Sequence, residues 1–103
     1  MPSFFASLAL FCILHTNQSA QKHSYIPPNG FVPNAITASK IAEAVLVPIY
    51  GEKEISKQKP FEIRLEGEIW IVRGKRPKDF IGGSAVIEIS KKNGCILRVS
   101  HSK

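Results

Sequence analysis

The sequence predicts an α+β domain in which one N-terminal helix packs on an antiparallel sheet of about four strands. Three observations support this fold class. Residues 34–51 have the apolar spacing of a helix, residues 60–100 contain four short runs with strand-like alternation, and turn signals divide these runs into two hairpins. A helix followed by antiparallel strands is typical of α+β domains, in which the helix covers one face of the sheet.

The first part of the chain has the layout of an export signal. The chain has 103 residues, which favours one domain, and its first 20 residues contain no Lys, Arg, Asp or Glu. Residues 4–14 form an apolar run that is shorter than the ~20 residues of a membrane span. A polar stretch ending in Ala20 follows. This layout predicts a signal peptide over residues 1–20, an extended arm over 21–30 and a single α+β domain over 31–103.

Export would place the mature domain in the periplasm or outside the cell, with no stable membrane span after cleavage of the signal. One feature argues against a signal peptide, because no Lys or Arg precedes the apolar run. The alternative is an ordinary buried segment or a frayed apolar N-terminus.

Residues 34–51 are the segment around which the rest of the chain is expected to fold. Asn34 suits an N-cap and Gly51 suits the position just past the helix end. Pro48 removes a backbone donor, so the helix is expected to kink or stop near Val47. One helical face carries the apolar residues Ala38, Ile41, Ala42, Val45 and Ile49, and Ile36, Leu46 and Val47 widen this stripe.

The remainder of the chain predicts a loop and four strands. Residues 52–59 are charged and lack apolar periodicity, so we expect a loop or a frayed extension of the helix there. Strands are expected over 60–66, 69–73, 85–90 and 95–100. The second strand is apolar on both faces, which favours a central position, and it carries Trp70, expected in the core. Asn93 and Gly94 indicate a tight turn between the last two strands.

The pattern of reactive residues does not favour catalysis. His23 and His101 lie near the ends of the mature chain, and Cys95 has no orienting carboxylate nearby in the sequence. We therefore predict a non-enzymatic protein without a metal or cofactor site. The acidic strand residues Glu62, Glu66 and Glu88 are expected to be cross-strand partners of Arg64, Arg73 or Arg98.

The net charge of +6 favours an acidic partner. An acidic protein, an anionic envelope surface and nucleic acid all fit, and export makes nucleic acid the weakest of the three. The basic residues concentrate in a loop between the two hairpins, which we name the basic loop. We predict that it binds the partner through Arg73, Lys75, Arg76, Lys78 and Phe80. The alternative is a solvated hairpin connection beside a core tryptophan.

The order of short motifs from residue 30 to the end resembles the bacterial family named nuclear transport factor two fold immunity protein, associated with polymorphic toxin systems. The shared segments are residues 30–33, 41–44, 48–51, 59–61, 70–72 with Gly74, 82–83, 87–89, 93–94 and 96–101. Cys95 departs from the family pattern, in which a charged residue is usual at this position.

The resemblance implies an abbreviated cystatin-like, or nuclear transport factor two-like, domain that neutralises a cognate toxin by direct binding. It brings no catalytic residues. One helix and two hairpins equally resemble the PepSY type of inhibitory domain, so an accessory envelope module without a toxin target is the alternative. The sequence leaves the oligomeric state open.

Overall fold

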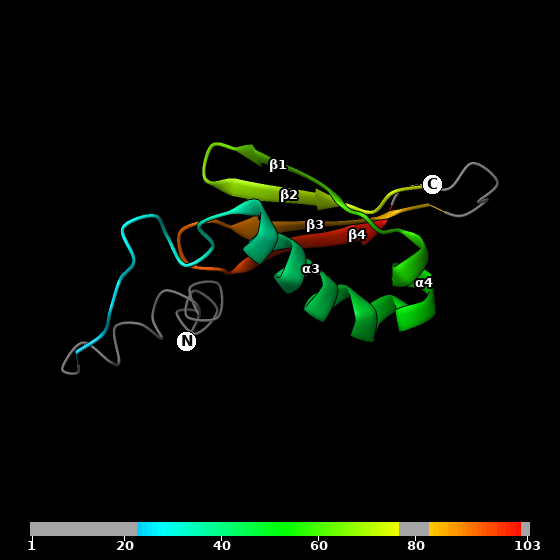
Figure 1. Cartoon of the computed structure of the whole chain (residues 1–103), viewed down its shortest axis with the longest axis horizontal. Coiled ribbons are helices and arrows are strands. Elements are labelled where there is room, and N and C mark those ends of the chain that lie inside the picture. Colours follow the sequence, from blue (N-terminus) through cyan, green and yellow to red (C-terminus); the bar gives the residue numbers. More distant parts are fainter. Residues whose placement is uncertain (1–22, 77–82, 102–103) are drawn as a thin grey trace, which may run out of the picture.

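The computed structural model describes residues 23–76 and 83–101 (Figure 1). Within these ranges, the helices α3 (Ala35–Tyr50) and α4 (Glu52–Lys57) precede the strands β1 (Glu62–Glu66), β2 (Ile69–Arg73), β3 (Ala85–Ser90) and β4 (Ile96–His101). The strands form one antiparallel sheet in the order β1-β2-β3-β4, and α3 lies across one face of it (Figure 1). The predicted α+β fold class is confirmed. The predicted signal peptide over residues 1–20 lies outside the described residues.

Helix α3 begins where the sequence predicts. The Asn34 side chain accepts a hydrogen bond from the backbone nitrogen of Thr37 at 2.9 Å, as expected of an N-cap. The face turned to the sheet differs from the prediction. Its centre is the row Ala38, Ala42 and Leu46, and Leu46 is 0% exposed. Ile49 was predicted on this face but is 54% exposed, because the row that packs on the sheet follows the i, i+4 spacing from Ala38.

Helix α3 does not stop near Val47, which was one of the two outcomes predicted for Pro48. The helix continues through Pro48 to Tyr50, and the Gly51 nitrogen donates to the Val47 carbonyl at 2.8 Å. Pro48 and Ala44 both lie on the exposed side, where the carbonyl crowded by the proline ring can tilt towards water. A proline one turn before the helix end therefore removes a single backbone hydrogen bond without ending the helix.

The prediction of a loop or a frayed extension over residues 52–59 is wrong, because residues 52–57 form a second helix, α4. Gly51, at a φ of 98°, separates the two helices. Glu52 and Glu54 lie in the first turn of α4 and Lys57 lies in its last, which suits the helix dipole. Ile55 is fully buried and anchors α4 to the core. One apolar residue in six gives no periodicity, so sequence patterning did not reveal this helix.

The four predicted strands are present, and β2 lies inside the sheet as expected. A two-residue turn at Gly67 and Glu68 joins β1 to β2, so Glu66 lies opposite Ile69. The hairpin of β3 and β4 closes around Gly94, which has a φ of 78°. Its register shifts between Glu88 and Ile89, a bulge that accommodates one extra residue in β4.

The core forms between α3 and the face of the sheet turned towards it. Trp70 is 8% exposed, as the sequence predicts, and its indole nitrogen donates to the Val32 carbonyl at 2.8 Å. Val32 is buried beside it, whereas the neighbouring Phe31 is exposed. The hydrogen bond connects the segment before α3 to the middle of the sheet.

Neither helix that the structure describes is long and apolar enough to cross a membrane.

Candidate functional site

The structure describes three of the five residues predicted to bind a partner. Arg73 is the last residue of β2 and is half-buried. Lys75 and Arg76 follow it and are exposed. Lys78 and Phe80 lie outside the described residues. The described part of the basic loop, up to residue 76, thus begins at the end of the central strand β2 (Figure 1).

The start and the end of the basic loop are both held by Gln58, which directly follows α4. The Gln58 backbone carbonyl accepts a hydrogen bond from the Lys75 nitrogen at 2.6 Å. Its side-chain oxygen accepts from the Ala85 nitrogen at 2.8 Å. Gln58 is only 3% exposed, so its side chain lies away from water. A buried group that loses its partner there cannot form a hydrogen bond to water instead. We call this arrangement the Gln58 clamp.

Gly74 leaves the space in which the Gln58 side chain lies. A Cβ atom added to Gly74 would come within 2.0 Å of Gln58 Oε1 and 2.9 Å of Gln58 Cβ. The Gly74 nitrogen also donates to the Ala85 carbonyl at 2.8 Å, which extends the pairing of β2 with β3 by one residue. Gly74 is therefore required for close approach to Gln58.

The face of the sheet turned away from α3 carries most of the strand charges. We call it the open face, and the strand register places eleven side chains on it: Glu62, Arg64, Glu66, Ile69, Ile71, Arg73, Val86, Glu88, Ser90, Arg98 and Ser100. The apolar side chains on this face belong to the central strands β2 and β3, which also carry Arg73 and Glu88, and the outer strands β1 and β4 contribute further charges. Apolar side chains among charged ones that include arginine are typical of protein-binding surfaces.

The three arginines on the open face have different ionic partners. Arg98 donates to Glu88 on the neighbouring strand at 2.8 Å, so the predicted cross-strand pair is confirmed there. Arg64 donates through Nε at 2.8 Å to Glu66, two residues away on its own strand rather than across the sheet. Arg73 lies opposite Glu62, yet among the described residues no carboxylate forms an ion pair with it.

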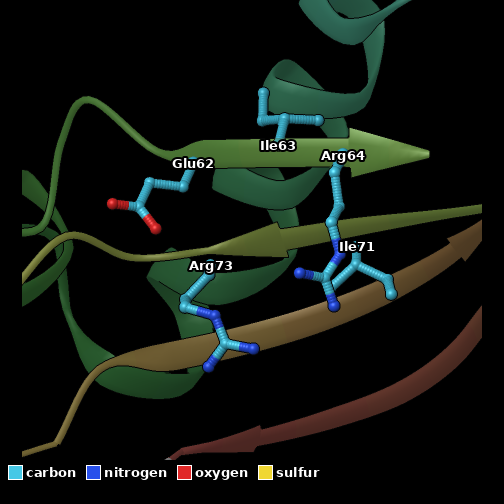
Figure 2. A pocket seen from close by; sticks show the side chains of 5 residues that line it. All are labelled: Glu62, Ile63, Arg64, Ile71 and Arg73. Atoms are coloured by element: carbon cyan, nitrogen blue, oxygen red, sulfur yellow. The ribbon is translucent and has the colours of Figure 1, made fainter. Parts of the chain in front are cut away.

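A shallow pocket of about 90 Å³ lies between β1 and β2 (Figure 2). Figure 2 shows the Arg64 and Arg73 guanidinium groups on the same side of the two strands, with Ile71 beside Arg64 and the Glu62 carboxylate beside Arg73. Ile63 also lines the pocket, but its side chain points to the other side. We call this the arginine pocket. It lies immediately before Gly74, so it is continuous with the described part of the basic loop.

Sequence reasoning placed Arg64 only as a salt-bridge partner and did not connect it with Arg73. The two-residue turn at Gly67 and Glu68 would have predicted the pairing of the two strands and hence the proximity of the arginines. Counting back from a two-residue turn pairs Arg64 with Ile71 and Glu62 with Arg73, which makes the two arginines diagonal neighbours on one face.

The histidine and cysteine considered for catalysis lie apart in the fold. Cys95 precedes β4 and His101 ends it. The Tyr50 hydroxyl and His101 Nδ1 are 3.3 Å apart, and the two rings meet edge to face. In residues 23–76 and 83–101, no three His, Cys, Asp or Glu side chains gather so as to hold a metal ion.

Comparison with known proteins relates the chain to one family. A family model described as NTF2 fold immunity protein matches residues 37–103, which include all four strands and the arginine pocket. The uncharacterized protein YbbC of Escherichia coli (strain K12) is 42% identical over 67 residues, 64% of this chain and 55% of YbbC. The uncharacterized protein YhhH of the same organism is 37% identical over 75 residues, 72% of this chain and 59% of YhhH. The chain thus spans a little over half the length of these relatives. No solved structure matches it.

Proposed function

Because the chain belongs to the NTF2 fold immunity proteins, we propose that it is a non-enzymatic binding protein that neutralises a cognate toxin by direct contact. The observation that carries this proposal is the extent of the family match. It covers most of α3, all four strands and the described part of the basic loop, so the similarity concerns the whole folded unit.

The fold supports neutralisation by occlusion. A stable protein–protein interface needs about 800 Å² from each partner, which is a large part of one face of a domain this small. The open face is a continuous antiparallel sheet of four strands, backed by α3. Because α3 packs on one face of the sheet, the other face is already rigid before binding. Little conformational entropy is then lost when a partner binds, which favours affinity. The toxin would be blocked by steric cover of its own functional surface.

The charge of the chain supports an acidic partner surface. The net charge is +6, and Arg73, Lys75 and Arg76 follow one another within four residues at the end of β2. Attraction between this region and an acidic surface would accelerate association and would weaken as salt is raised. Nucleic acid is a weaker candidate because we also propose export.

The proposed place of action is the periplasm or the extracellular space. The apolar run over residues 4–14 and the polar stretch ending at Ala20 support cleavage of a signal near that residue. Mass spectrometry of the protein recovered from the exported fraction tests this directly. The expected N-terminus is Gln21, and an intact Met1 in a purely cytoplasmic pool would contradict export.

The function is tested by growth protection. Where a gene next to that of this chain encodes a toxic domain, this domain is produced in a bacterial host and directed to the periplasm, with and without the full chain. Survival is expected with the full chain and loss of survival with a version lacking residues 1–20. Death of the host despite abundant, folded, exported chain would contradict neutralisation and favour an accessory envelope module.

A further inference from the structure

The arginine pocket places two cations beside each other with only one of them in an ion pair. Arg64 lies opposite Ile71 and Arg73 lies opposite Glu62, so the arginines are diagonal neighbours on adjacent strands, with a typical spacing of about 7–8 Å at the backbone. Two cationic side chains that extend from neighbouring positions on one face favour an anion between them. We propose that the pocket between Arg64 and Arg73 receives one Asp or Glu side chain of the partner protein, an inference that rests on the proposed function.

The donors fit a carboxylate. Arg64 uses its Nε for Glu66, which leaves its two terminal amino groups for another acceptor. Arg73 forms no ion pair with any described residue, so its whole guanidinium group is available. Guanidinium groups bind carboxylates in a planar, two-point geometry that lysine does not offer. An inserted carboxylate can therefore accept hydrogen bonds from both arginines.

The size of the pocket fits a side chain rather than a metabolite. Pockets for small-molecule ligands are roughly 300–1,000 Å³. The arginine pocket is about 90 Å³, enough for the end of one acidic side chain. Ile71 is half-buried beside Arg64 and offers an apolar contact for the methylene groups of such a side chain (Figure 2). Water excluded by this contact would strengthen the charged hydrogen bonds.

Replacement of Glu62 distinguishes an acidic occupant of the pocket from a basic one. Its carboxylate lies on the same side as Arg73 and lines the same pocket, so it would repel an acidic side chain and attract a basic one (Figure 2). Replacing Glu62 by Gln should therefore strengthen the binding of an acidic occupant. The same replacement should weaken the binding of a basic occupant, which would pair with Glu62 instead. A purely structural role of the pocket predicts no gain in affinity when Glu62 is replaced by Gln.

The first experiment measures the affinity of the full chain and its variants for an inactive variant of the toxin encoded beside its gene. Arg73→Ala and Arg64→Ala are each expected to weaken binding by about tenfold or more, since each removes one of the two charged donors of the partner carboxylate. Glu62→Gln is expected to tighten binding by a few-fold. Lys53→Ala removes the same charge from an exposed position on α4 and is expected to change affinity less than about twofold.

The second experiment uses a probe that does not depend on the toxin. A capped Gly-Glu-Gly peptide is titrated into the full chain while the resonances of the terminal Nη–H groups of the arginines are followed by NMR. Saturable shifts are expected for Arg64 and Arg73 and not for Arg98, which is already paired with Glu88. A Gly-Gln-Gly peptide is expected to produce none of these shifts.

The two experiments separate failure of the pocket from failure of the proposed function. Toxin binding that is unchanged by Arg64→Ala and Arg73→Ala would overturn the pocket and leave neutralisation intact. Peptide binding at Arg64 and Arg73 without any toxin binding would support the pocket and contradict neutralisation. Tighter toxin binding after Arg73→Ala, or weaker binding after Glu62→Gln, would assign a basic occupant and overturn the proposal. Equal peptide shifts at all three arginines would reduce it to nonspecific charge attraction.

Discussion

The Oε1 atom of Gln58 accepts a hydrogen bond from the backbone nitrogen of Ala85 at 2.8 Å, although the two residues are 27 positions apart in the chain. This bond connects the segment after α4 to the first residue of β3. Together with the bond from the Lys75 nitrogen to the Gln58 carbonyl, it holds both ends of the basic loop on one buried residue. The position of Lys75 and Arg76 therefore depends on Gln58.

Replacing Gln58 by Leu should destabilise the fold. Leucine is similar in size to glutamine but cannot accept a hydrogen bond. The variant therefore leaves the buried Ala85 nitrogen without its acceptor, which costs about 1–3 kcal/mol. Urea denaturation followed by circular dichroism measures the loss. The neighbouring Lys57→Ala, at an exposed position of α4, is the control and should stay within about 0.5 kcal/mol of the parent. A Gln58→Leu protein as stable as the parent would contradict the clamp.

Replacing Gly74 by Ala should be harmful only while Gln58 is present. The added methyl group would collide with the Gln58 side chain, and overpacking of this kind costs about 1–3 kcal/mol. A double-mutant cycle with Gln58→Gly measures the coupling, because this replacement removes both Oε1 and Cβ of Gln58. The cost of Gly74→Ala should fall sharply in the Gln58→Gly background. An equal cost in both backgrounds would show that Gly74 is needed for a reason other than the clamp.

The corrected face of α3 is tested by a pair of truncations. Leu46→Ala removes a fully buried side chain and should cost about 2–5 kcal/mol. Ile49→Ala removes a mostly exposed side chain one turn away and should cost less than about 1 kcal/mol. Thermal and urea unfolding of both variants give the comparison. A larger loss at Ile49 than at Leu46 would restore the face predicted from the sequence.

The hydrogen bond from Trp70 to Val32 is tested by Trp70→Phe. The variant keeps an aromatic ring in the core but leaves the Val32 carbonyl without its donor, so the loss should be about 1–3 kcal/mol. Circular dichroism is the appropriate signal, because Trp70 is the single tryptophan of the chain. Amide hydrogen exchange should also rise at Phe31 and Val32, whose nitrogens donate to the Lys92 and Lys91 carbonyls. Unchanged exchange there would contradict the proposed link.

The sequence was sufficient for those elements whose signals are local. Alternation of apolar and polar residues predicted β1, β3 and β4, a short apolar run predicted β2, and Asn34 marked the helix start. Trp70 was placed in the core because its strand neighbours are apolar. Such signals depend on residues within one turn or one strand, so no knowledge of the tertiary structure is needed.

The errors and omissions involve contacts between distant segments. Ile55 is the one buried residue of α4, and a single apolar position shows no periodicity. The Gln58 clamp joins residues from three segments, and a lone glutamine in a charged stretch gives no sign of burial. The arginine pocket depends on strand register, which the turn at Gly67 fixes but which composition alone does not reveal. Tertiary contacts determine each of these features.

The central claim is that the chain neutralises a toxin by binding it directly, and titration calorimetry tests this claim most directly. The purified chain is titrated with an inactive variant of the toxic domain encoded beside its gene, at low and at high salt. A saturable one-to-one complex is expected, with an affinity that decreases as salt is raised. Absence of binding at both salt concentrations, with both proteins folded by circular dichroism, would contradict neutralisation by direct binding.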